Sequence, residues 1–185
     1  MKVSLSVIAG MLLILSVLFI GPVAAATTGS AAITGNPKAS VSITLNQTSI
    51  YLNLDASQGQ PITNSSLGIV VSTNDPFFVA VTDNSGRGAG DQGYMGNYTS
   101  VYQTTPLNTK LASALSLSGT TNGTTTVGTI TPPITTVAQT LYTGGQKQGN
   151  QPLTTLLSQN VGYGDATLPS ASVYRIDLQF TITAM

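Results

Sequence analysis

The nine residues DNSGRGAGD at positions 83–91 combine two carboxylates, an amide and a hydroxyl with three glycines. Oxygen atoms of this kind are the ligands that calcium prefers, which makes a calcium site of Asp83, Asn84, Ser85 and Asp91 one interpretation. The spacing is not that of an EF-hand, and Arg87 stands where it can neutralise either carboxylate. The other interpretation is a glycine-rich loop between two strands, because Gly, Asn and Asp are the usual residues of tight loops.

Most enzymatic chemistry is excluded by composition. The chain has 185 residues but no His, Cys, Glu or Trp, and its six acidic residues are all Asp. Without His or Cys there is no Ser-His-Asp or Cys-His nucleophile and no usual zinc or copper site. Paired-carboxylate catalysis would depend on Asp alone. The glycines of 86–90 lead into more Gly and Tyr rather than into a helix, so a dinucleotide-binding loop is also excluded. We predict no catalytic residue and no enzymatic activity.

Two tyrosines follow this loop closely and are candidates for contact with a partner. Tyr94 and Tyr98 are the aromatic pair that we expect to be exposed. Aromatic side chains in a sandwich more often pack into the core. We assign Phe78, Tyr174 and Phe180 to the core for that reason.

The N-terminus is typical of a secretory signal peptide. Lys2 is followed by an uncharged apolar run over 3–20, and Ala24 and Ala26 are small residues at the positions that a signal peptidase reads. We predict cleavage after Ala26. The alternative is an uncleaved anchor, because about 18 apolar residues can nearly span a bilayer. Residues 27–38 are expected to form a flexible leader.

The remaining residues read as short strands. Apolar residues alternate with polar ones in 39–46 and again in 48–55, and the runs 67–73 and 76–83 have the length and composition of buried strands. The sequence Asn74-Asp75-Pro76 predicts a tight turn between the last two. At the C-terminus, five apolar residues of 174–183 alternate with five polar ones, which predicts one half-buried strand of about ten residues. Arg175 and Asp177 lie on its polar face, where they can pair.

The middle of the chain gives weaker signals. Residues 107–117 fit helical spacing but also alternate, so helix and strand both stay open there. Short strands are predicted near 125–130, 137–142 and 153–159, with a loop over 161–170. Together these patterns predict an all-β fold. We expect a single antiparallel β-sandwich of the Ig-like or Greek-key type, with about seven to nine strands, over residues 39–185.

Charge and glycosylation motifs further restrict the function. Without residues 1–26 the chain carries five basic and six acidic residues, a net charge of −1. No basic patch is available for nucleic acid. Four Asn-x-Ser/Thr sequons occur, which are candidate glycosylation sites in a secreted chain: Asn46, Asn64, Asn97 and Asn122.

The order of these segments resembles a known group of proteins. The runs SITLNQTSIYLNL, LGIVVSTNDPFFVAVTD, YMGNY, PLNTKLASALSL and LLSQNVGYGDATLPSASVYRIDLQFTITA are similar to small secreted β-sandwich domains of archaeal surface proteins, methanogen proteins especially, and loosely to WxL-type surface domains. The matching positions are Phe77, 159–165 and 174–181. The Trp of WxL domains is absent, so their cell-wall binding is not carried over, and the resemblance implies no catalytic residue.

We expect a non-enzymatic structural or adhesive protein that is secreted or held at the cell surface. Such a protein would be a subunit of an envelope layer, sheath or filament, in which strand edges contact other surface proteins or further copies of the chain. The alternative is an extracellular carbohydrate- or calcium-binding module. We expect no nucleic acid partner and no cofactor other than calcium. The membrane would be contacted only through an uncleaved signal segment.

Overall fold

The computed structural model describes residues 32, 34–35, 37–103, 110–120, 125–145 and 148–185, and the predicted signal peptide over 1–26 lies outside this range. Most of the predicted leader over 27–38 lies outside it as well. Residues 38–185 form one compact unit. The described residues form eleven strands: β1 (Val41–Leu45), β2 (Ile62–Thr73), β3 (Phe77–Asp83), β4 (Tyr94–Tyr98), β5 (Lys110–Ala114), β6 (Ser116–Gly119), β7 (Thr125–Val127), β8 (Gln139–Gly144), β9 (Gln148–Gln159), β10 (Val173–Arg175) and β11 (Leu178–Ala184).

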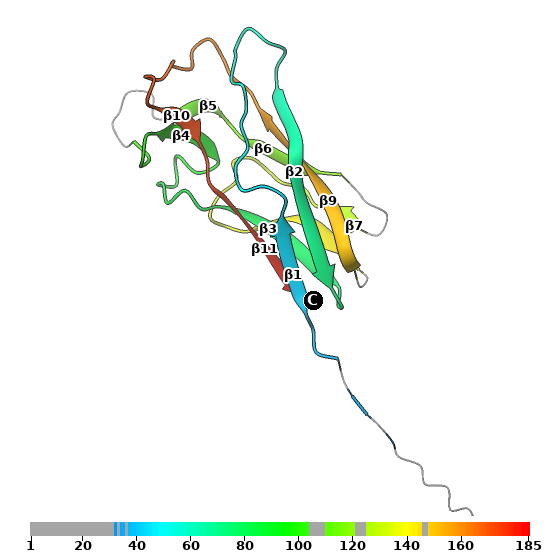
Figure 1. The fold of residues 1–185 in the computed structure, drawn as a ribbon. Coiled ribbons are helices and arrows are strands. Elements are labelled where there is room, and N and C mark those ends of the chain that lie inside the picture. Colours follow the sequence, from blue (N-terminus) through cyan, green and yellow to red (C-terminus); the bar gives the residue numbers. More distant parts are fainter. Residues whose placement is uncertain (1–31, 33, 36, 104–109, 121–124, 146–147) are drawn as a thin grey trace, which may run out of the picture. The chain divides into compact units, whose positions relative to one another are not determined.

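The strands form three sheets, and every pairing is antiparallel (Figure 1). One four-stranded sheet has the order β1-β2-β9-β6 and the other has the order β11-β3-β8-β7. A three-stranded sheet, β10-β4-β5, lies at one end of this pair. The predicted all-β sandwich is confirmed. The described residues contain more strands than the expected seven to nine, because the sequence patterns do not indicate the third sheet.

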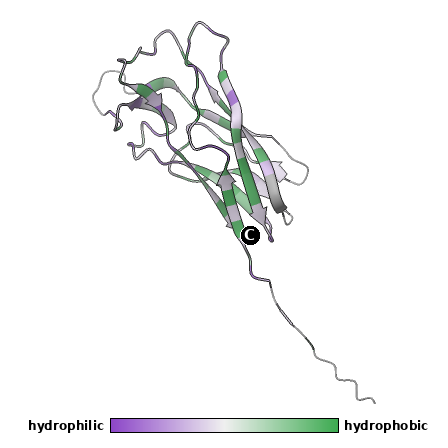
Figure 2. Cartoon of the chain, viewed as in Figure 1, coloured by the Kyte–Doolittle hydropathy of each residue, from purple (hydrophilic) through white to green (hydrophobic). Residues whose placement is uncertain are grey.

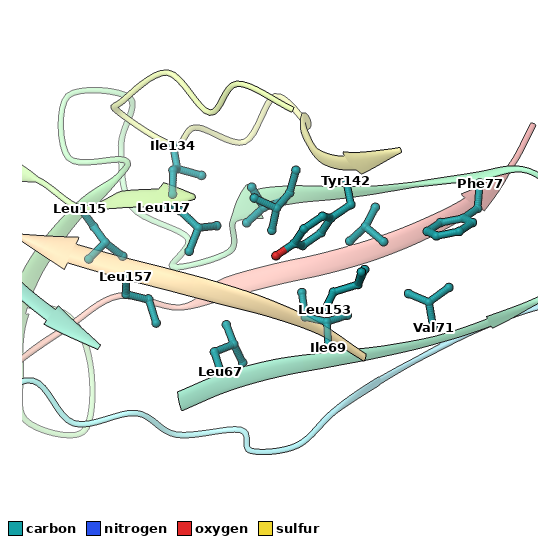
Figure 3. Close-up of a cluster of buried hydrophobic side chains, with 13 residues drawn as sticks. Leu67, Ile69, Val71, Phe77, Leu115, Leu117, Ile134, Tyr142, Leu153 and Leu157 are labelled. Carbon is teal, nitrogen blue, oxygen red and sulfur yellow. The ribbon is translucent and has the colours of Figure 1, made fainter. Parts of the chain in front are cut away.

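The core lies between the two four-stranded sheets. Inward residues of β2 and β9 face inward residues of β3 and β8 (Figure 3), and Figure 2 shows hydrophobic residues distributed along the strands. Burying this apolar surface is the main favourable contribution to folding. The largest fully buried side chains include Phe77 and Tyr142, whereas Phe78, Tyr174 and Phe180 are only partly buried. Phe77 rather than Phe78 points inward because β3 alternates with Val79 and Val81 on the core face.

The chain crosses between the two sheets through a short turn. Residues 74–76 connect β2 of one sheet to β3 of the other, as the Asn-Asp-Pro sequence predicts. The buried Thr73 stabilises the turn, since its hydroxyl donates to the carbonyl of Asp75 (2.8 Å) and accepts from the Asp75 N–H (3.0 Å). The chain crosses back between the sheets from β8 to β9. As a result β8 lies beside β3 in one sheet, and β9 lies beside β2 in the other.

Two sequence expectations for strands are wrong. The alternation in 48–55 predicts a strand, but these residues have no strand partner among the described residues. The C-terminal strand is not continuous: β10 pairs with β4, β11 pairs with β3, and Ile176 and Asp177 lie between them. Over 110–119 the chain is extended rather than helical, which decides the alternative left open for 107–117 in favour of strands β5 and β6.

Candidate functional site

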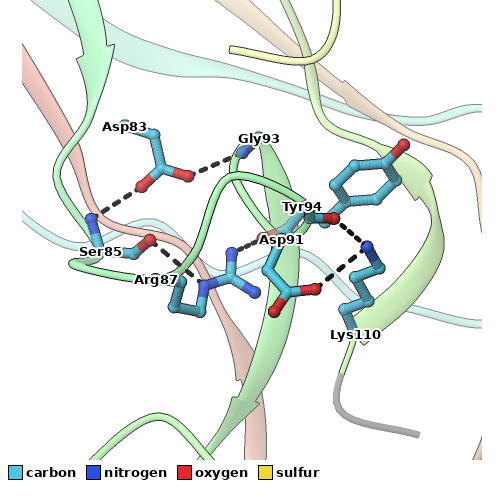
Figure 4. A network of polar contacts seen from close by, with 8 residues as sticks. Asp83, Ser85, Arg87, Asp91, Gly93, Tyr94 and Lys110 are labelled. Carbon is cyan, nitrogen blue, oxygen red and sulfur yellow. Dashed lines mark hydrogen bonds and ion pairs between the residues drawn. The ribbon is translucent and has the colours of Figure 1, made fainter. Parts of the chain in front are cut away.

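The loop after β3 is anchored by a buried carboxylate. Asp83 ends β3 with 3 % of its surface exposed, and its two oxygens accept the N–H groups of Ser85 and Gly93, each at 2.7 Å (Figure 4). Hydrogen bonds from neutral donors to a carboxylate are stronger than those to a neutral acceptor. Asp83 therefore closes the loop by joining its first turn to the residue before β4.

Gly93 allows this closure sterically. Its φ of 78° lies in the left-handed region, which L side chains rarely adopt. A Cβ at this position would lie 2.5 Å from the backbone nitrogen of Ile134, so only glycine fits. Its carbonyl accepts the N–H of Leu115 at 2.8 Å. The loop is thus held against buried residues at its C-terminal end.

Asp91, the second carboxylate, has a different partner. It lies 3.1 Å from the ammonium group of Lys110, and that ammonium group lies 4.3 Å from the centre of the Tyr94 ring. Lys110 also donates to the carbonyl of Gly90. The side chain of Asp91 is 45 % exposed, so this is a surface ion pair rather than a buried one.

Arg87 neutralises neither carboxylate. It donates to the hydroxyl of Ser85 (3.2 Å) and to the carbonyl of Tyr94, and its guanidinium carbon lies 4.9 Å from the centre of the Tyr102 ring. The expected pairing of Arg87 with Asp83 or Asp91 is wrong. Hydrogen bonds from the guanidinium instead hold the middle of the loop to β4.

A second group of side chains continues this arrangement towards β10. The Tyr98 and Tyr102 rings meet edge to face at 5.1 Å, and Arg175 lies 4.4 Å from the centre of the Tyr98 ring. Asp177 accepts from Arg175 (2.7 and 2.8 Å) and from the Tyr102 hydroxyl (2.8 Å). The predicted Arg175–Asp177 pair is confirmed. Burial, together with the neighbouring Asp177 carboxylate, raises the pKa of Tyr102.

We call these six side chains the aromatic–cation cluster: Arg87, Tyr94, Tyr98, Tyr102, Lys110 and Arg175. The cluster borders an open hollow of 460 Å³ between the loop and the 98–103 turn. Arg87, Tyr98, Tyr102 and Gln103 are among the residues that line it. Tyr94 and Tyr98 are partly buried, each with a cation against its ring.

The four candidate calcium ligands each have contacts within the protein. Asp83 and Asp91 have the separate partners described above, Ser85 bonds Arg87, and Asn84 is exposed while its N–H donates to the Asp177 carbonyl at 2.8 Å. Within the described ranges there is no group of three or more His, Cys, Asp or Glu side chains that can hold a metal ion. The loop is also no hairpin, because β3 and β4 belong to different sheets.

The sequons lie in different environments. Asn46 is exposed, and its side chain bonds the backbone of Ser66 and Gly68, each at 2.8 Å. Asn64 is partly buried and accepts from both the N–H and the hydroxyl of Ser66. The Oδ1 atom of Asn97 is buried without a hydrogen-bond partner among the described residues. Asn122 lies outside the described residues.

Sequence reasoning missed much of this site. It did not assign Lys110, Tyr102 or Asp177 to the loop, because their contacts join segments up to 75 residues apart. The sequence offered one indication of these contacts: with so few charged residues in the chain, those of opposite charge are expected to pair with one another.

Comparison of the chain with protein families, with curated proteins and with solved structures found no match to any of them. Over the described ranges, the chain has no helix with the length and apolar character needed to cross a membrane.

Proposed function

We propose that this chain is a non-enzymatic structural or adhesive protein, secreted or held at the cell surface as a subunit of an envelope layer, sheath or filament. The proposal rests on one observation: the Asp side chains that could perform chemistry make contacts within the protein instead. Asp83 and Asp177 bond to groups of the protein itself, and Asp91 is paired with Lys110. The three Asp residues that line the groove beside 48–54 also accept hydrogen bonds from the protein itself: Asp55 from Ser57, Asp165 from the N–H groups of Ala112 and Gly162, and Asp177 from Tyr102.

Composition supports the same proposal. The chain has no His, Cys or Glu, and only 6 % of its residues are charged. Its polar surface is supplied mainly by Thr, Ser, Asn and Gln. Uncharged surfaces of this kind do not repel one another, which favours close packing of subunits. The resemblance to secreted archaeal surface domains and the expected signal peptide point to the cell exterior.

The proposal is tested by locating the native protein and measuring its mass. Cells are fractionated into medium, membrane and envelope, and the intact mass of the recovered chain is determined. We expect a mature chain that begins after Ala26, carries glycan on the sequons and is recovered with the envelope or as an assembly. A chain that stays in the cytoplasm, or one that is a monomer at high concentration and does not associate with the envelope, would overturn the proposal.

A second candidate function, saccharide binding, is favoured by the hollow beside the aromatic–cation cluster. Its volume of 460 Å³ is within the usual range for small-ligand sites. Tyr98 and Tyr102 supply aromatic surface, while Arg87 and Gln103 supply hydrogen-bond donors. Titration with a panel of neutral and acidic oligosaccharides, followed by NMR, tests this candidate. Chemical-shift changes confined to residues lining the hollow would support saccharide binding. Loss of these changes in Gln103→Ala would identify the hollow as the site. If no saccharide causes any change, this candidate function is rejected.

A further inference from the structure

Residues 48–54, the connection that leaves β1, have the side-chain pattern of a strand without a partner strand. Ile50, Leu52 and Leu54 are partly buried and alternate with exposed side chains. Tyr51, which points outward, is 81 % exposed. Figure 1 shows this connection running from β1 to β2 without being part of a sheet. Alternation of this kind is expected of a strand with one face on the core.

The backbone of this segment is largely free of hydrogen bonds. Among the described residues, its one hydrogen bond runs from the side-chain amide of Asn64 to the Tyr51 carbonyl, at 3.4 Å. Backbone N–H and C=O groups are strong hydrogen-bonding groups that are nearly always paired when they become buried. A row of such free groups along an extended chain is a template for another strand.

Unlike the edges of the three-stranded sheet, this segment carries no charge. That sheet ends on β5 and β10, which bear Lys110 and Arg175 respectively. Residues 46–54, in contrast, contain no charged residue, no proline and no glycine. Charged residues, prolines or bulges usually prevent the edge strands of natural proteins from pairing with other chains. The edge strands of the two four-stranded sheets, β1, β6, β7 and β11, carry no charge either, so the absence of charge permits pairing along 48–54 but is shared with these edges.

An open groove runs beside the segment. Its volume is 1270 Å³, its apolar lining includes Ile50, Leu52, Ile176 and Phe180, and its polar lining includes Asp55, Asp165 and Asp177. Leu67, Leu111 and Leu115 also line the groove and are buried. A strand added along 48–54 can therefore place alternate apolar side chains in this groove. Its backbone then provides affinity and its side chains provide specificity.

We infer that residues 48–54 pair antiparallel with the same residues of a second copy of this chain. This inference deepens the proposed function, on which it rests, by naming the surface through which subunits meet. A two-fold axis at Tyr51 sets Ile50 opposite Leu52 and Ser49 opposite Asn53, so that apolar faces apolar and polar faces polar over 49–53. At the two ends of the segment Thr48 lies opposite Leu54. Asp55 lies opposite Gln47, which avoids the like-charge contact that destabilises cross-strand pairs. The central residues 49–53 are therefore complementary to themselves.

The test compares Tyr51→Lys with Val137→Lys in the mature chain as cells produce it. Both side chains are highly exposed, 81 % and 71 %, and Val137 lies outside the groove. In Tyr51→Lys, the two-fold axis places the two introduced ammonium groups opposite each other. We expect sedimentation velocity to show a dimer for wild type and for Val137→Lys, and at least a tenfold weaker dimer for Tyr51→Lys. A wild-type monomer at millimolar concentration, or an unchanged dimer in Tyr51→Lys, would overturn the inference.

Cross-linking provides a second test that does not depend on weakening the dimer. The chain has no cysteine, so Tyr51→Cys introduces one thiol at the proposed two-fold axis. We expect mild oxidation to link Tyr51→Cys into a dimer and to leave Val137→Cys monomeric; equal linking of both variants would contradict the pairing. Envelope fractionation of wild type evaluates the proposed function separately, because envelope association without a dimer rejects only the inference.

Discussion

At the scale of single residues, Asp83 shows how a residue that looks reactive acquires a structural role. It ends a buried strand, so its carboxylate is already surrounded by protein when the chain turns. A buried carboxylate needs hydrogen-bond donors, and the nearest ones are the backbone N–H groups of the loop itself. The carboxylate therefore determines the shape of the loop after β3.

Replacing this carboxylate with an amide should destabilise the protein. In Asp83→Asn, one oxygen can still accept an N–H, but the amide NH₂ then faces the other backbone donor. We expect the free energy of unfolding to fall by about 1–3 kcal/mol, measured by urea denaturation. Asp91→Asn is the matched control, because loss of its exposed ion pair should cost about 0–1 kcal/mol. Equal effects of the two variants would show that Asp83 is not the anchor.

The same contacts predict the response to calcium. Because the oxygens of Asp83 accept backbone N–H groups and Asp91 pairs with Lys110, binding of calcium would first require these contacts to break. We expect millimolar calcium to leave the thermal unfolding midpoint unchanged and to produce no heat in calorimetry. A rise in the midpoint that disappears in both Asp83→Ala and Asp91→Ala would restore the calcium interpretation of this loop.

At the scale of elements, alternation and turn residues predicted the strands that form the sandwich. Residues 39–46 and 76–83 correspond to β1 and β3, residues 67–73 correspond to the C-terminal part of β2, and the Asn-Asp-Pro turn lies where the chain changes sheets. These signals are local, because the alternation of apolar and polar residues that marks a half-buried strand lies within the strand's own sequence. β4 has the sequence YMGNY, which has no such alternation, and the sequence patterns do not predict it.

The remaining errors concern pairing, which depends on distant residues. Residues 48–54 have the pattern of a strand and the corresponding burial, but no strand of the described chain pairs with them. In the C-terminal run, alternation continues unbroken while the partner changes from β4 to β3. The change occurs at Asp177, which bonds Arg175, Tyr102 and the backbone of Asn84. For the same reason the candidate site was predicted only where its residues are close in sequence.

Asp177 should hold the three-stranded sheet to the sandwich. Asp177→Asn weakens the contacts to Arg175 and Tyr102, both of which lie at this sheet. We expect amides in the β4–β10 pair to exchange with deuterium faster in this variant, while those of β3 and β11 keep their protection. Asp55→Asn, which lies in a separate loop and bonds Ser57, should change neither pair. Uniform acceleration across all sheets would instead indicate a global loss of stability.

At the scale of the whole molecule, low charge leaves few groups whose titration can affect stability. The described tyrosines include three whose pKa is raised, in each case mainly by burial: Tyr102 beside the loop, Tyr142 in the core and Tyr174 in β10. They lie in different parts of the unit formed by residues 38–185. Their combined titration therefore reports on the fold as a whole rather than on one site.

The sign of the effect follows from proton linkage. The folded protein holds these phenolic protons more tightly than the unfolded chain, whose tyrosines titrate near the ordinary value of about 10. Stability is therefore fully present below about pH 10, the ordinary value, and is lost as the pH rises from there through the higher pKa values of the folded protein. We expect the free energy of unfolding, measured in urea, to be nearly flat from about pH 7 to about pH 9 and to fall steeply above about pH 10. Tyr102→Phe should make the alkaline decline shallower, because it removes one of the three groups, whereas Val137→Ala should leave it unchanged, since it replaces an exposed side chain that carries no titratable group. A decline of equal steepness in both variants would show that folding does not raise the pKa of Tyr102.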